Sequence, residues 1–198
     1  MTRRALTGIL EEAPPSVYIN DRFYQELDEH HTRGRGRPDA QEMREEIANF
    51  LAFEGRLLDE QRFEEWLELM DDRCLYWVPS SYPPDAAGKT VSVTLDDRRR
   101  LLDRIARLRT GYAYSQEPPS RTQRSLSSVE VWHYGPETGD FISRASFQVA
   151  ELRNSEITRH HGIYEHVLRP AAGSFVICQK RIILLNADEI LPNVSFIF

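Results

Sequence analysis

The chain has 198 residues, enough for one domain with a substantial core. Its formal charge of −6 disfavours broad attraction to nucleic acid or to an anionic membrane, and no apolar run approaches the roughly 20 residues that span a bilayer. The first residues lack the apolar segment of a secretory signal, and the two cysteines, Cys74 and Cys178, lie far apart. We therefore expect a cytoplasmic protein with reduced thiols.

Residues 1–38 show little periodic pattern and are interpreted as an N-terminal arm ahead of a single domain over residues 39–198. The arm is either flexible or loosely docked, or it becomes ordered on a partner. Within it, Arg35-Gly36-Arg37-Pro38 matches the core of an AT-hook, which binds the minor groove of DNA. One short copy in an acidic protein does not support a prediction of DNA binding.

Two amphipathic helices are expected between residues 39 and 70. Asp39 and Glu42 have the spacing of a capping box at the start of the first helix. In the second helix, apolar side chains recur at i, i+3, i+4 and i+7, which places them on one face. They are Phe63, Trp66, Leu67 and Met70.

Glu54 falls on the apolar stripe of the first helix, so its carboxylate points towards the core or its rim. One interpretation is a pocket acid whose pKa is raised by burial. The other is a carboxylate that is paired with a nearby arginine or placed at a subunit contact. The second is favoured, because a buried carboxylate is rarely left unpaired.

A strand rich in aromatic and branched residues is predicted over residues 74–78, and prolines close it. Gly88-Lys89-Thr90 resembles the end of a P-loop, but Pro83 occupies the position of the required earlier glycine, so no phosphate site is predicted. Residues 91–95 alternate as a half-buried strand. Asp96 or Asp97 can then cap a third helix.

The third helix carries arginines over much of its outer surface. They form either a solvated face or a docking surface for an acidic partner. These arginines are Arg98, Arg99, Arg100, Arg104, Arg107 and Arg109.

Four long strands are predicted over residues 126–134, 141–153, 156–168 and 174–186. The links between them are short and rich in turn-forming residues, so the strands are expected to be antiparallel neighbours. Helices followed by long antiparallel strands indicate the α+β class.

Several short segments occur in a characteristic order along the chain. They are Leu57-Leu58-Asp59-Glu60, Phe63-Glu64-Glu65-Trp66-Leu67, Tyr76-Trp77-Val78-Pro79, the helix from Arg104 to Leu108, and Ser120-Arg121-Thr122 before Val129-Glu130-Val131. This order, from about Gln41 to Asn186, resembles the β (small) subunit of aromatic-ring-hydroxylating dioxygenases. These enzymes are multicomponent Rieske non-haem iron oxygenases.

The resemblance implies a cone-like fold similar to nuclear transport factor 2 and scytalone dehydratase. In that fold a strongly curved, mostly antiparallel (mixed) sheet wraps around three N-terminal helices. The resemblance also implies a hexamer in which a trimer of β subunits supports three α subunits. The Rieske [2Fe–2S] cluster and the mononuclear Fe(II) then lie in α, and a reductase supplies electrons from NAD(P)H. The complex dihydroxylates an aromatic compound during its catabolism, and this chain is expected to be its non-catalytic subunit.

The cysteines and histidines that could bind iron also favour a non-catalytic subunit. Neither Cys74 nor Cys178 is followed two residues later by a histidine, as a Rieske centre requires. His160, His161, Glu165 and His166 are the cluster to consider for mononuclear iron, but strand alternation puts His160 and His166 on one face and the other two on the opposite face. We therefore expect cross-strand polar contacts here, and no cofactor or metal in this chain.

Cone-like folds also host cofactor-free isomerases, dehydratases and cyclases, and such a pocket enzyme is the alternative function. Its candidate acid–base residues are Glu54, Tyr76, His133 and Tyr164, although no spacing brings them together.

Large obligate interfaces favour aromatic residues and arginine. The candidates for contacts between subunits are Tyr76, Trp77, Tyr82, Arg98, Arg99, Tyr112, Tyr114, Trp132, Phe196, Ile197 and Phe198. Removal of Val194 to Phe198 is expected to weaken assembly if this C-terminal tail lies in an interface.

Overall fold

The computed structural model describes residues 21–82, 84, 92–110, 116–135, 138–189 and 195–198. Its six-stranded sheet has the order β2-β1-β6-β5-β4-β3. The strands are β1 (Met70–Pro79), β2 (Ser92–Asp97), β3 (Arg121–His133), β4 (Phe141–Arg153), β5 (Glu156–Ala171) and β6 (Ser174–Leu184). The helices are α2 (Asp21–Arg33), α3 (Arg44–Asp59), α4 (Phe63–Glu68) and α5 (Arg98–Thr110), with a 3₁₀ turn over Gln41–Met43.

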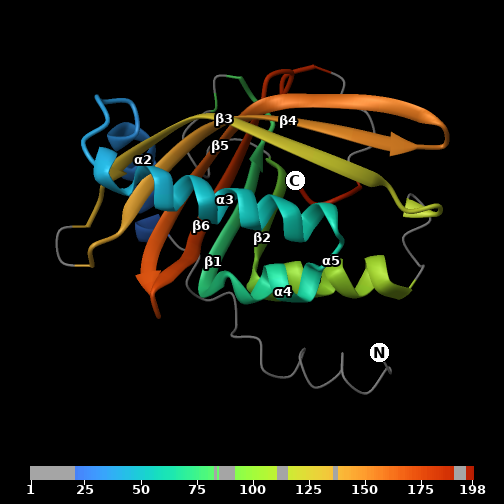
Figure 1. Ribbon diagram of the computed structural model, residues 1–198, viewed down its shortest axis with the longest axis horizontal. Coiled ribbons are helices and arrows are strands. Elements are labelled where there is room, and N and C mark those ends of the chain that lie inside the picture. Colours follow the sequence, from blue (N-terminus) through green and yellow to red (C-terminus); the bar gives the residue numbers. More distant parts are fainter. Residues whose placement is uncertain (1–20, 83, 85–91, 111–115, 136–137, 190–194) are drawn as a thin grey trace.

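The curved sheet wraps around three helices, as Figure 1 shows. Helices α3, α4 and α5 cover its inner face, and α2 lies against the outer face. The α+β prediction is confirmed, including the antiparallel order of the last four strands. None of the helices among the described residues is long and apolar enough to cross a membrane.

One strand pair departs from the antiparallel pattern. β1 pairs in parallel with β6, and the register places Tyr76 beside Lys180 and Trp77 beside Arg181. A parallel pair needs a long crossover, which the intervening strands and α5 supply. This pairing brings residues more than 100 positions apart onto neighbouring strands.

Curvature arises from local irregularities. β3 is bulged between Ser127 and Glu130, where Ser128 has a φ of 53°, and such a bulge bends a strand.

At Gly162 a Cβ atom would collide with the carbonyl oxygen of Ile183 and lie 2.9 Å from Phe147 Cε1, so this close approach requires glycine.

The helix starts agree with the sequence only in part. Asp97 Oδ1 accepts a hydrogen bond of 2.8 Å from the backbone N–H of Arg100, so the predicted cap of α5 is confirmed. The predicted capping box at Asp39 is wrong. Asp39 Oδ1 instead accepts a hydrogen bond of 2.9 Å from the backbone N–H of His133, and Glu42 pairs with the ring of His133 at 2.9 Å. Both side chains contact His133 of β3, so they do not cap the helix. Helix α3 begins at Arg44.

From residue 21 onwards the arm is docked on the sheet. Phe23 and Tyr24 of α2 pack against Leu75 and Trp77 on the outer face of β1. The helix therefore covers apolar side chains that would otherwise face solvent.

Polar contacts hold the end of the arm. His30 Nδ1 lies 2.9 Å from Gln179 Oε1, and Trp132 Nε1 donates a hydrogen bond of 3.0 Å to the carbonyl of Gly36. Gly36, in the middle of the AT-hook-like sequence, is thus part of this intramolecular contact.

Candidate functional site

A cluster of charged residues is buried at the centre of the cone, around Glu54 of α3. Glu54 is 1% exposed, and its Oε1 accepts hydrogen bonds from Lys180 Nζ at 2.6 Å and from Trp66 Nε1 at 3.0 Å. Its Oε2 lies 3.5 Å from His166 Nε2. Four elements, α3, α4, β5 and β6, supply these side chains, so the cluster ties the helices to the sheet.

The neighbours of Glu54 decide its charge. Burial alone raises the pKa of this carboxyl, but Lys180 and His166 outweigh burial and hold the pKa well below its usual range. The less favoured interpretation, a pocket acid with a raised pKa, is therefore wrong. The preferred interpretation, a paired carboxylate, is confirmed, with Lys180 as the partner instead of an arginine.

His166 differs from Glu54 in its charge. Burial lowers the pKa of His166, although Glu54 opposes this shift, so its ring is neutral at pH 7. Glu54 is consequently an ionised, fully buried carboxylate without a free proton to donate.

The structure brings three of the four candidate acid–base residues into one core. Tyr164 is 2% exposed and stacks on Phe147 with ring centroids 3.9 Å apart. The hydroxyl of Tyr76 accepts a hydrogen bond of 2.9 Å from the backbone N–H of Phe198. Burial raises the pKa of both tyrosines, so both remain protonated.

His133 is not part of this core. Its side chain is 56% exposed, and it pairs with Glu42 at the outside of the molecule. The proposed set of four acid–base residues therefore does not form.

The residues near the C-terminus fill the interior beside this cluster. Phe196, Ile197 and Phe198 are 7%, 1% and 1% exposed, and the ring centroid of Phe198 lies 5.9 Å from that of Phe147. A void of about 40 Å³ remains next to Phe196 and Ile197. Pockets for small molecules measure about 300–1,000 Å³, so this void is far too small for an aromatic substrate.

Lys180 and His166 were missed as partners of Glu54. A signal for both exists in strand parity: Lys180 alternates in phase with Ile182 and Leu184, and His166 alternates in phase with Tyr164. A lysine or histidine in phase with core residues calls for a buried counter-charge. The sequence does not show that the same carboxylate serves both.

Residues 53–189 match the family model described as "Ring hydroxylating beta subunit", which is more than half of the chain. The chain belongs to this family. This ring-hydroxylating β subunit is 30% identical over 166 residues to the 3-phenylpropionate/cinnamic acid dioxygenase subunit beta of Photorhabdus laumondii. The match covers 79% of this chain and 92% of the relative. The chain is 31% identical over 152 residues to the small oxygenase component of the p-cumate 2,3-dioxygenase system of Pseudomonas putida, covering 76% and 83%.

Solved structures show the same fold. The β subunit of benzoate 1,2-dioxygenase from Burkholderia mallei matches this β subunit with a TM-score of 0.62 at 21% identity, covering 82% of this chain and 99% of that one. The cone-like fold implied by the sequence resemblance, of the nuclear transport factor 2 type, is confirmed.

The interface candidates of this β subunit fall into three groups. Tyr82 and the side chain of Arg99 are 43% and 53% exposed, and Arg98 is partly exposed. Tyr112 and Tyr114 lie outside the described residues. The remaining candidates are buried within the subunit itself and offer little surface to a partner: Tyr76, Trp77, Trp132, Phe196, Ile197 and Phe198.

The histidines of β5 make separate contacts instead of forming one site. His160 pairs with Glu151 at 3.2 Å, and Glu165 pairs with both Arg144 and Arg181. The predicted cross-strand polar contacts are confirmed. Among the residues that the structure describes, no three metal-ligating side chains gather into one group.

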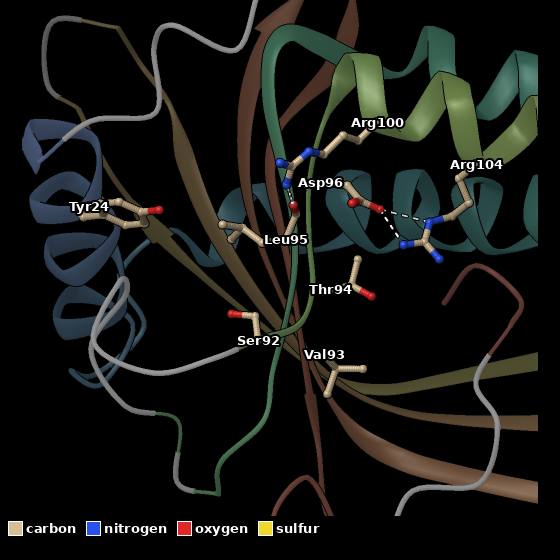
Figure 2. Close-up of a pocket in the computed structure, with 8 residues that line it drawn as sticks. All are labelled: Tyr24, Ser92, Val93, Thr94, Leu95, Asp96, Arg100 and Arg104. Carbon is tan, nitrogen blue, oxygen red and sulfur yellow. Dashed lines mark hydrogen bonds and ion pairs between the residues drawn. The ribbon is translucent and has the colours of Figure 1, made fainter.

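A second hollow lies at the edge of the sheet, outside the cone. This groove has a volume of about 410 Å³ and runs between α2, strand β2 and the start of α5 (Figure 2). Its lining residues are Tyr24, Ser92, Val93, Thr94, Leu95, Asp96, Arg100 and Arg104.

Proposed function

We propose that this chain is the structural small subunit of an aromatic-ring dioxygenase and that the large subunit performs the chemistry. In this role the chain forms a trimeric base in a cytoplasmic complex of three large and three small subunits. The two curated relatives are named for 3-phenylpropionate, cinnamic acid and p-cumate. Aromatic acids are therefore the first substrates to test.

The packing around Glu54 among the described residues carries this proposal. In a pocket enzyme of this fold, an acid or base would face a cavity that admits the substrate. Here Glu54 is ionised and held by Lys180 and Trp66, while Phe198 and its neighbours occupy the adjoining space. The cofactor-free alternative is therefore not favoured.

The cysteines do not fit a Rieske cluster. Cys74 packs in the inner core, whereas Cys178 contacts the outer cluster around Trp132, so the two thiols lie on opposite faces of the sheet. Burial raises the pKa of each thiol to about 12. Cluster ligands are thiolates, so this geometry supports placing the cluster in the large subunit.

Co-expression with the large subunit tests the proposal, followed by size-exclusion chromatography, iron analysis and turnover of an aromatic acid. We expect co-elution at the mass of a three-plus-three hexamer and no bound iron in the small subunit alone. A small subunit that does not co-elute with the large subunit would refute the proposal.

The variant Tyr164→Phe separates a structural role from a catalytic one, because it removes only a hydroxyl from the core. In the assembled complex this variant is expected to keep wild-type turnover. A large loss of turnover with an intact hexamer would favour a pocket enzyme. Leu185→Ala, at a side chain that is 60% exposed, is the control for handling and expression.

A further inference from the structure

The groove at β2 has a feature that a partner chain can use. β2 lies at one edge of the sheet, and among the described strands β1 is its neighbour. An edge strand exposes backbone N–H and C=O groups that can pair with an added strand. In Figure 2, Tyr24 of α2 stands on the far side of the groove from Leu95 and Ser92 of β2.

Most arginines of α5 are engaged within the subunit. Arg98 donates to the carbonyls of Leu67 and Met70 at 2.7 and 2.6 Å. Arg104 binds Asp96 at 2.6 Å, and Arg109 binds Glu64 at 2.6 Å. These arginines hold α5 in place, so they do not form the free docking face that the sequence allowed.

Arg100 is different, because its side chain lines the groove. Its Nη1 donates to the carbonyl of Leu95 at 2.8 Å. Among the described residues, no carboxylate forms an ion pair with its guanidinium. A guanidinium can bind a carboxylate with two parallel hydrogen bonds.

The charges around Arg100 favour an acidic ligand. α5 contains six arginines and one aspartate, in a chain whose formal charge is −6. Asp96, the carboxylate that lines the groove, is neutralised by Arg104. The groove therefore combines an edge strand, a guanidinium that pairs with no carboxylate of the described residues, and the apolar side chain of Val93, which is 42% exposed.

We propose that this groove binds an extended, acidic segment of the dioxygenase large subunit. The segment lies along β2, places a carboxylate on Arg100 and packs an apolar side chain against Val93. This inference rests on the proposed function, because it names the surface through which the two subunits meet.

Two pairs of matched variants test the proposal. Arg100→Glu reverses the charge in the groove, and Arg159→Glu makes the same change at an exposed side chain of β5 that does not line it. Val93→Glu places a carboxylate on the edge strand without touching Arg100, and Ile157→Glu makes a similar change on β5, where Ile157 is 59% exposed. Binding of each variant to the purified large subunit is measured by titration calorimetry at low and high salt.

We expect Arg100→Glu and Val93→Glu each to weaken binding at least about tenfold at low salt, with the difference shrinking at high salt. The two control variants should bind like the wild type. Melting temperatures close to the wild-type value would show that each variant is folded.

Three results would overturn the inference. The first is equal loss in the test variants and their controls, and the second is no loss in any of them. The third is loss of self-association with unchanged binding to the large subunit, which would assign the groove to a second copy of this chain. A wild-type chain that fails to bind the large subunit would instead refute the proposed function.

Discussion

Replacing Lys180 with methionine is the most direct test of the buried cluster. Lys180 and Glu54 have side chains that are 0% and 2% exposed, with 2.6 Å between their charged atoms. The variant removes the positive charge and leaves the carboxylate of Glu54 with Trp66 and a neutral His166. Breaking one side of a buried ion pair costs about 3–5 kcal/mol, because the remaining charge is desolvated without compensation.

The expected change in melting temperature follows from the size of the chain. In proteins of this length 1 kcal/mol corresponds to about 2–4 °C, so Lys180→Met should lower the midpoint by roughly 6–20 °C. Differential scanning calorimetry of the isolated subunit measures this shift. The double variant Glu54→Gln/Lys180→Met removes both charges and should recover much of the loss, since Gln can still accept the hydrogen bond from Trp66.

Arg62→Met is the matched control. Arg62 and Glu65 also form an ion pair at 2.6 Å, but their side chains are 40% and 53% exposed. Solvent screens this pair, so its loss should scarcely move the midpoint. A stabilising buried pair is refuted if Lys180→Met shifts the midpoint no more than Arg62→Met, or if the double variant is no more stable than Lys180→Met alone.

Two further predictions concern the folded subunit. Burial lowers the pKa of His30 and His166, so below about pH 6.5 the unfolded state binds more protons than the folded state. The free energy of unfolding is therefore highest above this pH. It falls on acidification by up to about 1.4 kcal/mol per pH unit for each histidine. Melting curves between pH 7.5 and 5 should show this slope, and His166→Asn should reduce it; an unchanged slope would contradict the assignment. Phe198→Ala should destabilise the isolated subunit by about 3–5 kcal/mol in urea unfolding, whereas a loss confined to assembly would return Phe198 to the interface.

The regular elements could be predicted because their signals are local. The stripe of Phe63, Trp66 and Leu67 and the alternation in β4 depend on residues a few positions apart. The turn at Asn154-Ser155 is local as well: both residues have positive φ, as in a two-residue hairpin turn.

The remaining features depend on tertiary contacts that no local pattern encodes. Asp39 has the spacing of a helix cap, yet its carboxylate accepts a hydrogen bond from the backbone of His133 on β3, 94 residues away in the sequence. The partner of Glu54 lies 126 residues along the chain. The apolar residues Phe196 to Phe198 suggest an interface when only the sequence is considered, but in the folded subunit they are buried in the main core.

The parallel pairing of β1 with β6 has a consequence for how the chain reaches its native state. β1 ends at Pro79 and β6 begins at Ser174, so β1 has only the short β2 as a neighbour until almost the whole chain has emerged from the ribosome. Contacts so distant in sequence form slowly, and apolar surface such as Trp66 and Tyr76 is exposed in the meantime. Nascent chains are thus most prone to aggregate before β6 is added, and slower synthesis or a chaperone that shields β1 should raise the yield of native subunit.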